Sequence, residues 1–145
     1  MQKVKRYLAL DVGDKTIGVA VSDLLALTAQ GITTIKRTSI KNDLKTIGDL
    51  INQYEVGTIV VGLPKNMNGT EGERCDFVRK FANKIVNVYK INIQFFDERL
   101  STVAAEKSLI SADVSRRKRK AVIDKMAAVH ILQGFLDGLR LKGEF

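Results

Sequence analysis

Three acidic residues that are far apart in the sequence could act together: Asp11, Glu98 and Asp124. Asp11 ends an apolar run that is too hydrophobic to face water, so its carboxylate must be paired, protonated or bound to a cation. Three carboxylates in one desolvated place would repel one another unless a divalent cation neutralised them. Oxygen ligands without histidine or cysteine favour Mg²⁺ or Mn²⁺ over zinc. These acids are therefore the candidate catalytic and metal-binding residues.

The expected positions of these acids explain how they could converge. Asp11 and Glu98 stand at the carboxyl ends of expected strands, which is where ligands gather in open α/β sheets. Steps of 100° per residue place Asp124 within about 40° of one line with three apolar residues further along its helix, Ala128, Ile131 and Phe135. Asp124 is thus expected on the buried face of the last helix, near its amino end.

Each acid also has an ordinary structural interpretation. A strand-end aspartate often caps a turn, Glu98 could pair with Arg99 or Arg37, and Asp124 lies between Lys120 and Lys125. Carboxylates of this kind are commonly just paired with a basic side chain at the surface. The residues alone leave both interpretations open.

A run of five basic residues directly precedes the expected last helix: Arg116, Arg117, Lys118, Arg119 and Lys120. Such a run is most often a solvated segment. Here its side chains could grip phosphates and deliver a nucleic-acid backbone to the acids, because the helix that follows carries Asp124. Few aromatic residues are interleaved, so base stacking is not indicated in this run.

A second candidate for anion binding is the segment 62–70, because the amides at a helix start attract anions. An ordinary connection between a strand and a helix explains its proline and turn-forming residues equally well. Outside the basic run, the candidate nucleic-acid contacts are four polar side chains in turns or at strand ends: Lys15, Lys65, Asn66 and Arg99.

Composition limits the class of protein and its partners. With 145 residues and 45% hydrophobic content, the chain is expected to form one domain, 1–145, with a substantial core. The 24 Lys and Arg residues exceed the 16 Asp and Glu residues and leave a net charge of +8. This surplus favours a polyanionic partner or an anionic membrane surface, and nucleic acid is the commoner explanation.

Targeting signals and cysteine usage narrow the class further. No run of about 18 apolar residues is present, and the amino terminus lacks the pattern of a signal peptide. We therefore expect a cytoplasmic protein without a membrane partner. The single cysteine, Cys75, excludes an internal disulfide and a cysteine-based metal site, and its place on an apolar helical stripe predicts burial.

Apolar periodicity predicts the elements that position these residues. Two strands within 8–23 should form a hairpin around Gly13 and Asp14, because both residue types favour tight turns. Three further strands are expected at 30–36, 58–62 and 91–96, the first of them at an edge. Helices are expected at about 40–54, 70–88, 101–110 and 120–139. This order implies a mixed sheet with helices on both faces.

Helix starts have their own signals. Thr70 and Glu73 have the spacing of a capping box, in which each side chain satisfies an amide at the start of a helix. This spacing predicts that the second helix starts at Thr70. Ser101 or Thr102 could cap the third helix in a similar way.

Four motifs that span nearly the whole chain resemble the YqgF (RuvX) family. They occupy residues 11–20, 60–69, 97–102 and 120–128. The resemblance implies an α/β protein with an RNase H-like fold, whose mixed five-stranded sheet has the order 3-2-1-4-5 with strand 2 antiparallel. It also implies that Asp11, Glu98 and Asp124 are the family's acidic triad.

The resemblance implies a nuclease, because the family has been described both as Holliday junction resolvases and as nucleases that mature the 5′ end of pre-16S rRNA. We therefore expect a hydrolase that uses Mg²⁺ or Mn²⁺ to cleave precursor rRNA. The alternatives are resolution of branched DNA and a non-catalytic role in which the protein binds RNA in ribosomal precursor particles. The hairpin at Asp11 also suggests an actin-like ATP site, but such a site lies between two domains and the length supplies one.

Overall fold

A computed structural model of the chain describes residues 5–100 and 116–143, and within the second range it describes side chains from Lys125 onward. Five strands are present: β1 (Arg6–Val12), β2 (Thr16–Ser22), β3 (Ala29–Lys36), β4 (Val56–Leu63) and β5 (Asn92–Asp97). The helices are α1 (Ile40–Tyr54), α2 (Glu73–Tyr89), the short 3-10 helix η1 (Glu98–Leu100) and α4 (Arg116–Lys142). The strands agree with the expected ones to within two residues at each end.

The five strands form one sheet in the order β3-β2-β1-β4-β5. β2 is antiparallel to both β1 and β3, whereas β1, β4 and β5 run parallel. The expected order and the expected change from antiparallel to parallel pairing are therefore confirmed. Because β1, β4 and β5 are parallel, their carboxyl ends all lie at one edge of the sheet, which we call the carboxyl edge.

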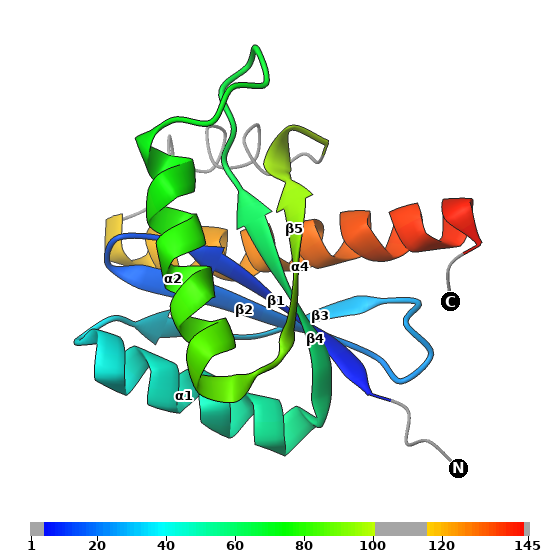
Figure 1. Cartoon of the computed structure of the whole chain (residues 1–145), viewed down its shortest axis with the longest axis horizontal. Coiled ribbons are helices and arrows are strands. Elements are labelled where there is room, and N and C mark those ends of the chain that lie inside the picture. The colour runs from blue at the N-terminus through cyan, green and yellow to red at the C-terminus, as the bar shows by residue number, and fades with distance from the viewer. Residues whose placement is uncertain (1–4, 101–115, 144–145) are drawn as a thin grey trace.

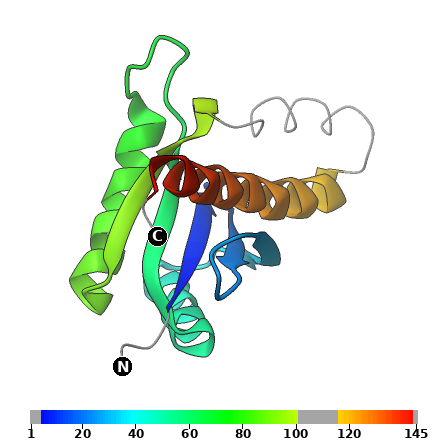
Figure 2. The same ribbon diagram turned by 90° about the vertical axis from the view of Figure 1, so that its right-hand side faces the viewer.

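Helices cover both faces of the sheet. Figures 1 and 2 show α1 and α2 on one face and α4 across the other. Large side chains such as Leu8, Leu10 and Val61 point toward α1 and α2. Small residues dominate the opposite face, where Ala9 and Ala20 pack against the alanines of α4. Since successive side chains of a strand alternate between faces, one buried run can supply both surfaces.

Helix α4 packs close to the sheet through small residues on both sides of the contact. Ala128 and Ile131 are fully buried, and the ring of Phe135 lies 5.6 Å from that of Tyr7. This confirms the apolar stripe that the sequence predicts along the helix. Among the described residues, no helix is long and apolar enough to cross a membrane.

The start of α2 differs from the prediction. The helix begins at Glu73, and its N-cap is Gly72, which has no side chain that could cap the helix. The Thr70 hydroxyl instead donates to Asn68 Oδ1 at 2.6 Å and accepts from Asn66 Nδ2 at 3.0 Å. The predicted capping box is therefore wrong, because the preceding loop uses the threonine hydroxyl for its own hydrogen bonds.

The start of α4 also differs from the prediction. The helix begins at Arg116, so the basic run 116–120 forms its first turn and does not precede it. Arginine and lysine are strong helix formers, which outweighs the unfavourable placement of positive charge at a helix amino end. The expected helix at 101–110 and its possible caps Ser101 and Thr102 lie outside the described residues. Cys75 is buried, as the sequence predicts.

Candidate active site

Asp11 lies at the carboxyl edge, one residue before the end of β1, and is only 7% exposed. Its cross-strand partner on β2 is Gly18. On the other side, β1 and β4 are paired up to Leu10 and Val61, so the next step of this register puts Asp11 beside Gly62. The buried carboxylate thus stands between two strands that carry no Cβ next to it, on the face of the sheet covered by α4.

Glu98 lies close to the same glycine. It directly follows β5 as the first residue of η1 and is 8% exposed. A Cβ placed on Gly62 would lie 3.2 Å from Glu98 Cγ and 2.5 Å from Ile131 Cδ1. Only glycine therefore lets the Glu98 side chain and α4 approach β4 here. Asp11 on β1 and Glu98 after β5 thus flank β4 from its two sides, on the same face of the sheet.

Asp124 belongs to α4, and its side chain lies outside the described residues. It is seven residues before Ile131, which corresponds to about two turns and about 10 Å along the same side of the helix. Toward its amino end α4 passes from Tyr7, at the start of β1, to Gly62 near the end of β4. Among the described side chains, no three of His, Cys, Asp or Glu form a metal-binding group. The third acid therefore stays a prediction.

The turn that follows β1, residues 13–15, is held by Arg37. Its Nη1 donates to the Gly13 carbonyl at 2.9 Å, and its backbone N–H donates to the Lys15 carbonyl at 2.8 Å. Arg37 Nε donates to Asp43 Oδ2 at 3.0 Å, and Asp43 is 2% exposed. The guanidinium also lies over the Phe81 ring, 4.8 Å from its centroid. A buried ion pair thus fixes the backbone two residues after Asp11.

Arg74 contacts the same turn from the solvent side. Its Nη1 donates to Asp14 Oδ1 at 2.8 Å, and its Nη2 lies 3.5 Å from the Val12 carbonyl oxygen. Its guanidinium stacks over Phe77 at 5.0 Å. Sequence reasoning did not identify Arg74 or Asp43 as site residues. The only sequence signal for this network was Asp43, an acidic residue in the first turn of an amphipathic helix.

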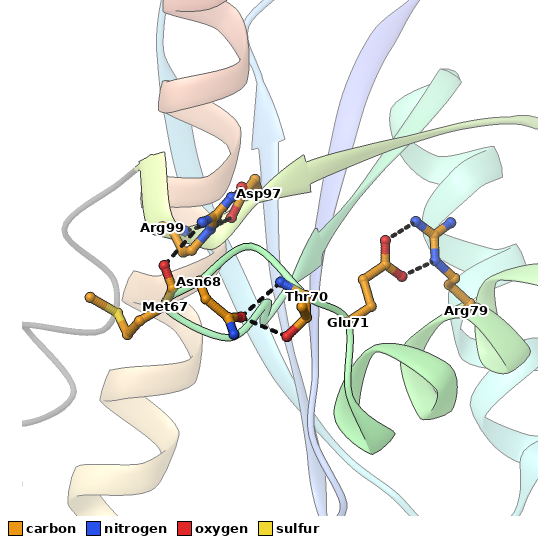
Figure 3. Close-up of polar contacts among 7 residues, drawn as sticks. All are labelled: Met67, Asn68, Thr70, Glu71, Arg79, Asp97 and Arg99. Atoms are coloured by element: carbon orange, nitrogen blue, oxygen red, sulfur yellow. Dashed lines mark hydrogen bonds and ion pairs between the residues drawn. The ribbon is translucent and has the colours of Figure 1, made fainter.

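A second arginine network holds the loop between β4 and α2, residues 64–72 (Figure 3). Arg99 Nη2 donates to Asp97 Oδ2 at 2.6 Å, and its Nη1 donates to the Met67 carbonyl at 3.3 Å. The side-chain hydrogen bond from Arg99 lowers the pKa of Asp97 and in turn raises the pKa of Arg99. Arg99 therefore links the loop to the residue that precedes Glu98.

The predicted nucleic-acid contacts lie in several places. Lys15 is exposed in the turn after β1, Lys65 is half-buried and Asn66 is exposed in the 64–72 loop. Lys65 also contributes to the lowered pKa of Asp97, which places its charge near that carboxylate. Arg99 is exposed, with its guanidinium bonded as described above. The residues Arg116, Arg117, Lys118, Arg119 and Lys120 form the start of α4, and their side chains lie outside the described residues.

A family model described as "RuvX: Holliday junction resolvase" matches residues 5–138. A Clostridioides difficile protein named "Putative pre-16S rRNA nuclease" is 59% identical over 132 residues, which cover 91% of this chain and 94% of that protein. A Clostridium tetani protein of the same name is 54% identical over 134 residues, covering 92% and 97%. These relatives agree with the resemblance that the four motifs indicate.

Solved structures with the same fold include Holliday junction resolvases. RuvC of Thermus thermophilus, solved in complex with a Holliday junction substrate, has a TM-score of 0.58 at 8% identity, covering 94% of this chain and 96% of that one. The yeast mitochondrial Holliday junction resolvase Ydc2 has a TM-score of 0.53 at 11% identity, covering 94% and 79%. At such low identity these similarities show the fold alone, which is RNase H-like as expected. The match of the family model and the identity to the clostridial proteins show that this chain belongs to the RuvX family.

Proposed function

We propose that the protein is a metal-dependent endonuclease that cleaves phosphodiester bonds in precursor 16S rRNA. One observation carries this proposal: Asp11 and Glu98, from distant parts of the sequence, are both less than a tenth exposed and lie on one face beside Gly62. Buried carboxylates brought together from distant parts of a sequence are typical of a hydrolytic site. The names of the clostridial relatives support precursor rRNA as the substrate.

The donor set fits a hard divalent cation. Asp11 and Glu98 offer only oxygen atoms, and the described residues around them add no histidine or cysteine ligand. Mg²⁺ or Mn²⁺ would be held by Asp11, Glu98 and, from α4, Asp124. When bound, such an ion supplies an activated water molecule and stabilises the charge on the leaving oxygen.

The residues of the chain would orient the substrate around these acids. Arg37 fixes the turn after Asp11 through the Gly13 carbonyl and so limits the movement of the carboxylate. Basic side chains at the start of α4, together with Lys15 and Lys65, would contact phosphates and position the backbone without reading sequence. We place this activity in the cytoplasm, on ribosomal precursor particles.

Substitution of Asp11 tests the proposal most directly. Asp11→Asn should lower the cleavage rate of a pre-16S 5′-end RNA in Mg²⁺ by at least about 100-fold, because even residues that only support a metal ligand are often worth 10–100-fold. EDTA should abolish cleavage and Mg²⁺ should restore it. Asp49→Asn, on the exposed side of α1, is the matched control and should cleave normally. Unchanged cleavage by Asp11→Asn would contradict the proposal.

The family description favours a second substrate, the four-way DNA junction. The same acids would act on either nucleic acid, so both substrates should be assayed side by side. Cleavage of the junction alone would make the protein a resolvase. Tight binding of both substrates with cleavage of neither would indicate a non-catalytic assembly factor.

A further inference from the structure

Met67 is the most exposed large apolar side chain among those described, at 91%. It lies near the middle of the 64–72 loop between β4 and α2, and Figure 3 shows its side chain directed away from the Arg99 and Asp97 pair. Leu100, next to Arg99, is 74% exposed. Single exposed apolar residues are common on protein surfaces, so exposure alone does not indicate a ligand contact. The structure around Met67 supplies the further evidence.

The loop that carries Met67 is held in one shape by its own hydrogen bonds. Asn66 N–H donates to the Thr70 carbonyl at 2.9 Å, and Gly69 N–H donates to the Asn66 carbonyl at 2.8 Å. Gly69 has a φ of 88°, which side-chain-bearing residues rarely adopt. The Asn68 side chain accepts from both the N–H and the hydroxyl of Thr70. Met67 is therefore presented by a preorganised turn.

The loop is also fixed relative to the candidate active site. Arg99 donates to the Met67 carbonyl and binds Asp97, which holds the backbone at Met67 against the residues on either side of Glu98. The loop leaves β4 at the carboxyl edge, where Asp11 also lies. A nucleic acid whose phosphate reached the acids would therefore have its neighbouring bases near this loop.

We propose that Met67 inserts between two stacked bases beside the scissile phosphate, so that the protein selects a nucleic acid that is kinked or unpaired there. Unbranched apolar side chains such as methionine can wedge between base steps and unstack them. The net charge of +8 and the positive charge of Lys65, in the same loop, favour a polyanion over a protein partner. This inference rests on the proposed function and adds the shape of the substrate to it.

Base unstacking can be measured directly with 2-aminopurine, whose fluorescence rises when it leaves the stack. The probe is an RNA duplex with a single-stranded 5′ extension that carries 2-aminopurine at the first unpaired position. It is mixed with the full-length Asp11→Asn chain in Mg²⁺, and fluorescence is read on mixing. We expect a rise with this chain, its loss with Met67→Ala added, and binding about tenfold weaker for that variant. No rise with Asp11→Asn alone would overturn the proposal.

Two further variants separate an apolar wedge from other contacts. Met67→Leu should keep most of the fluorescence rise, because it keeps an apolar side chain of similar length. Met67→Lys should lose the fluorescence rise. If this variant instead bound RNA more tightly and kept the rise unchanged, residue 67 would contact a phosphate, and the proposal would be overturned. Leu25→Ala is the matched control, since Leu25 is 72% exposed in the β2–β3 turn and should change neither signal.

The outcome can be separated from that of the proposed function. The 2-aminopurine signal reports binding and needs no cleavage, whereas the Asp11→Asn cleavage assay needs no contact by Met67. Equal RNA binding and equal fluorescence by all Met67 variants would overturn the inference, leave the nuclease proposal intact, and point to a protein surface as the partner of this loop.

Discussion

Two loops leave the sheet at the carboxyl edge, and each is held by its own arginine. The two arginines differ in how far they are buried. The turn 13–15 is held by Arg37, whose side chain is 10% exposed and is paired with an Asp43 side chain that is 3% exposed. The loop 64–72 is held by Arg99, whose side chain is 34% exposed and whose partner Asp97 is 15% exposed. The first network is part of the core between the sheet and the helices α1 and α2, whereas the second faces solvent.

This difference matches the tasks that we assign to the two loops. The turn after β1 carries the backbone next to Asp11, which we propose as a metal ligand, so small displacements there should disturb the carboxylate. The 64–72 loop is proposed to contact the substrate, so it can be fixed by a pair that adds little to global stability. Breaking a buried pair leaves an uncompensated buried charge, whereas breaking an exposed pair returns both groups to water. Variants of the two arginines should therefore fail in different ways.

The largest effect on stability is expected from Arg37→Met. This change removes the guanidinium but leaves the Asp43 carboxylate buried, with the Thr38 N–H still donating to it at 3.2 Å. The free energy of unfolding should fall by about 3–5 kcal/mol, as for other buried pairs that lose one partner. Urea denaturation followed by circular dichroism measures this change.

Controls for Arg37→Met separate the charge from the contacts. Asp43→Asn keeps a polar side chain that can accept hydrogen bonds, and should cost less. Cleavage by folded Arg37→Met, measured well below its melting temperature, should also be slower, because the Gly13 carbonyl has lost its donor. A loss of stability under about 1 kcal/mol would show that the two loops are held alike.

A smaller effect is expected from Arg99→Met, and it should appear in binding and in acid titration. The loop would lose its donor to the Met67 carbonyl, so RNA affinity should fall by about threefold to tenfold while the melting temperature changes little. The pKa of Asp97 should rise toward its ordinary value, because the Arg99 hydrogen bond is the main cause of its lowering. Fluorescence anisotropy and carboxyl NMR measure the two changes.

The sign of the pH dependence follows from the lowered pKa. A carboxylate whose pKa is lower in the folded state contributes stability above its unfolded pKa and loses it as the pH falls through the folded pKa. The link between Asp97 and Arg99 should thus persist into mild acid in the wild type and be absent in Arg99→Met. Asp23 is an internal control, because the backbone N–H of Thr28 is the main cause of its lowered pKa and is not altered. An unchanged Asp97 titration would contradict this assignment.

Most of the fold could be predicted from the sequence because its signals are local. Continuous apolar runs predict strands buried on both faces, and three- and four-residue spacing predicts the helices that cover them. The errors fall where two local signals compete. Thr70 has the spacing of a helix cap, but its hydroxyl serves a loop that Gly69 turns, and the basic run has both high charge and high helix propensity.

The candidate site could be predicted only in part. Asp11 and Glu98 were identifiable because each ends a strand, and strand ends at one edge converge. The roles of Arg37 and Asp43 could not be predicted. The contact between Arg37 and the Gly13 carbonyl spans 24 residues and depends on how α1 folds back on the sheet. The contact of Arg99 with Met67 spans 32 residues and was hidden for the same reason. Local patterns thus indicate candidate acids, whereas the residues that hold the adjoining loops become visible only in three dimensions.

The smallest effect is expected from Arg74→Met, which tests whether the turn 13–15 depends on its solvent-exposed contacts. The side chains of Arg74 and Asp14 are 48% and 72% exposed, so their pair is screened by water and salt. Methionine keeps an apolar contact with Phe77, and the free energy of unfolding should fall by less than about 1 kcal/mol. Asp14→Asn should give a similar change, and both should shrink in high salt. If Arg74→Met lowered the free energy of unfolding as much as Arg37→Met, the exposed contacts would also hold the turn 13–15. The burial of Arg37 would then not be what distinguishes this turn from the 64–72 loop.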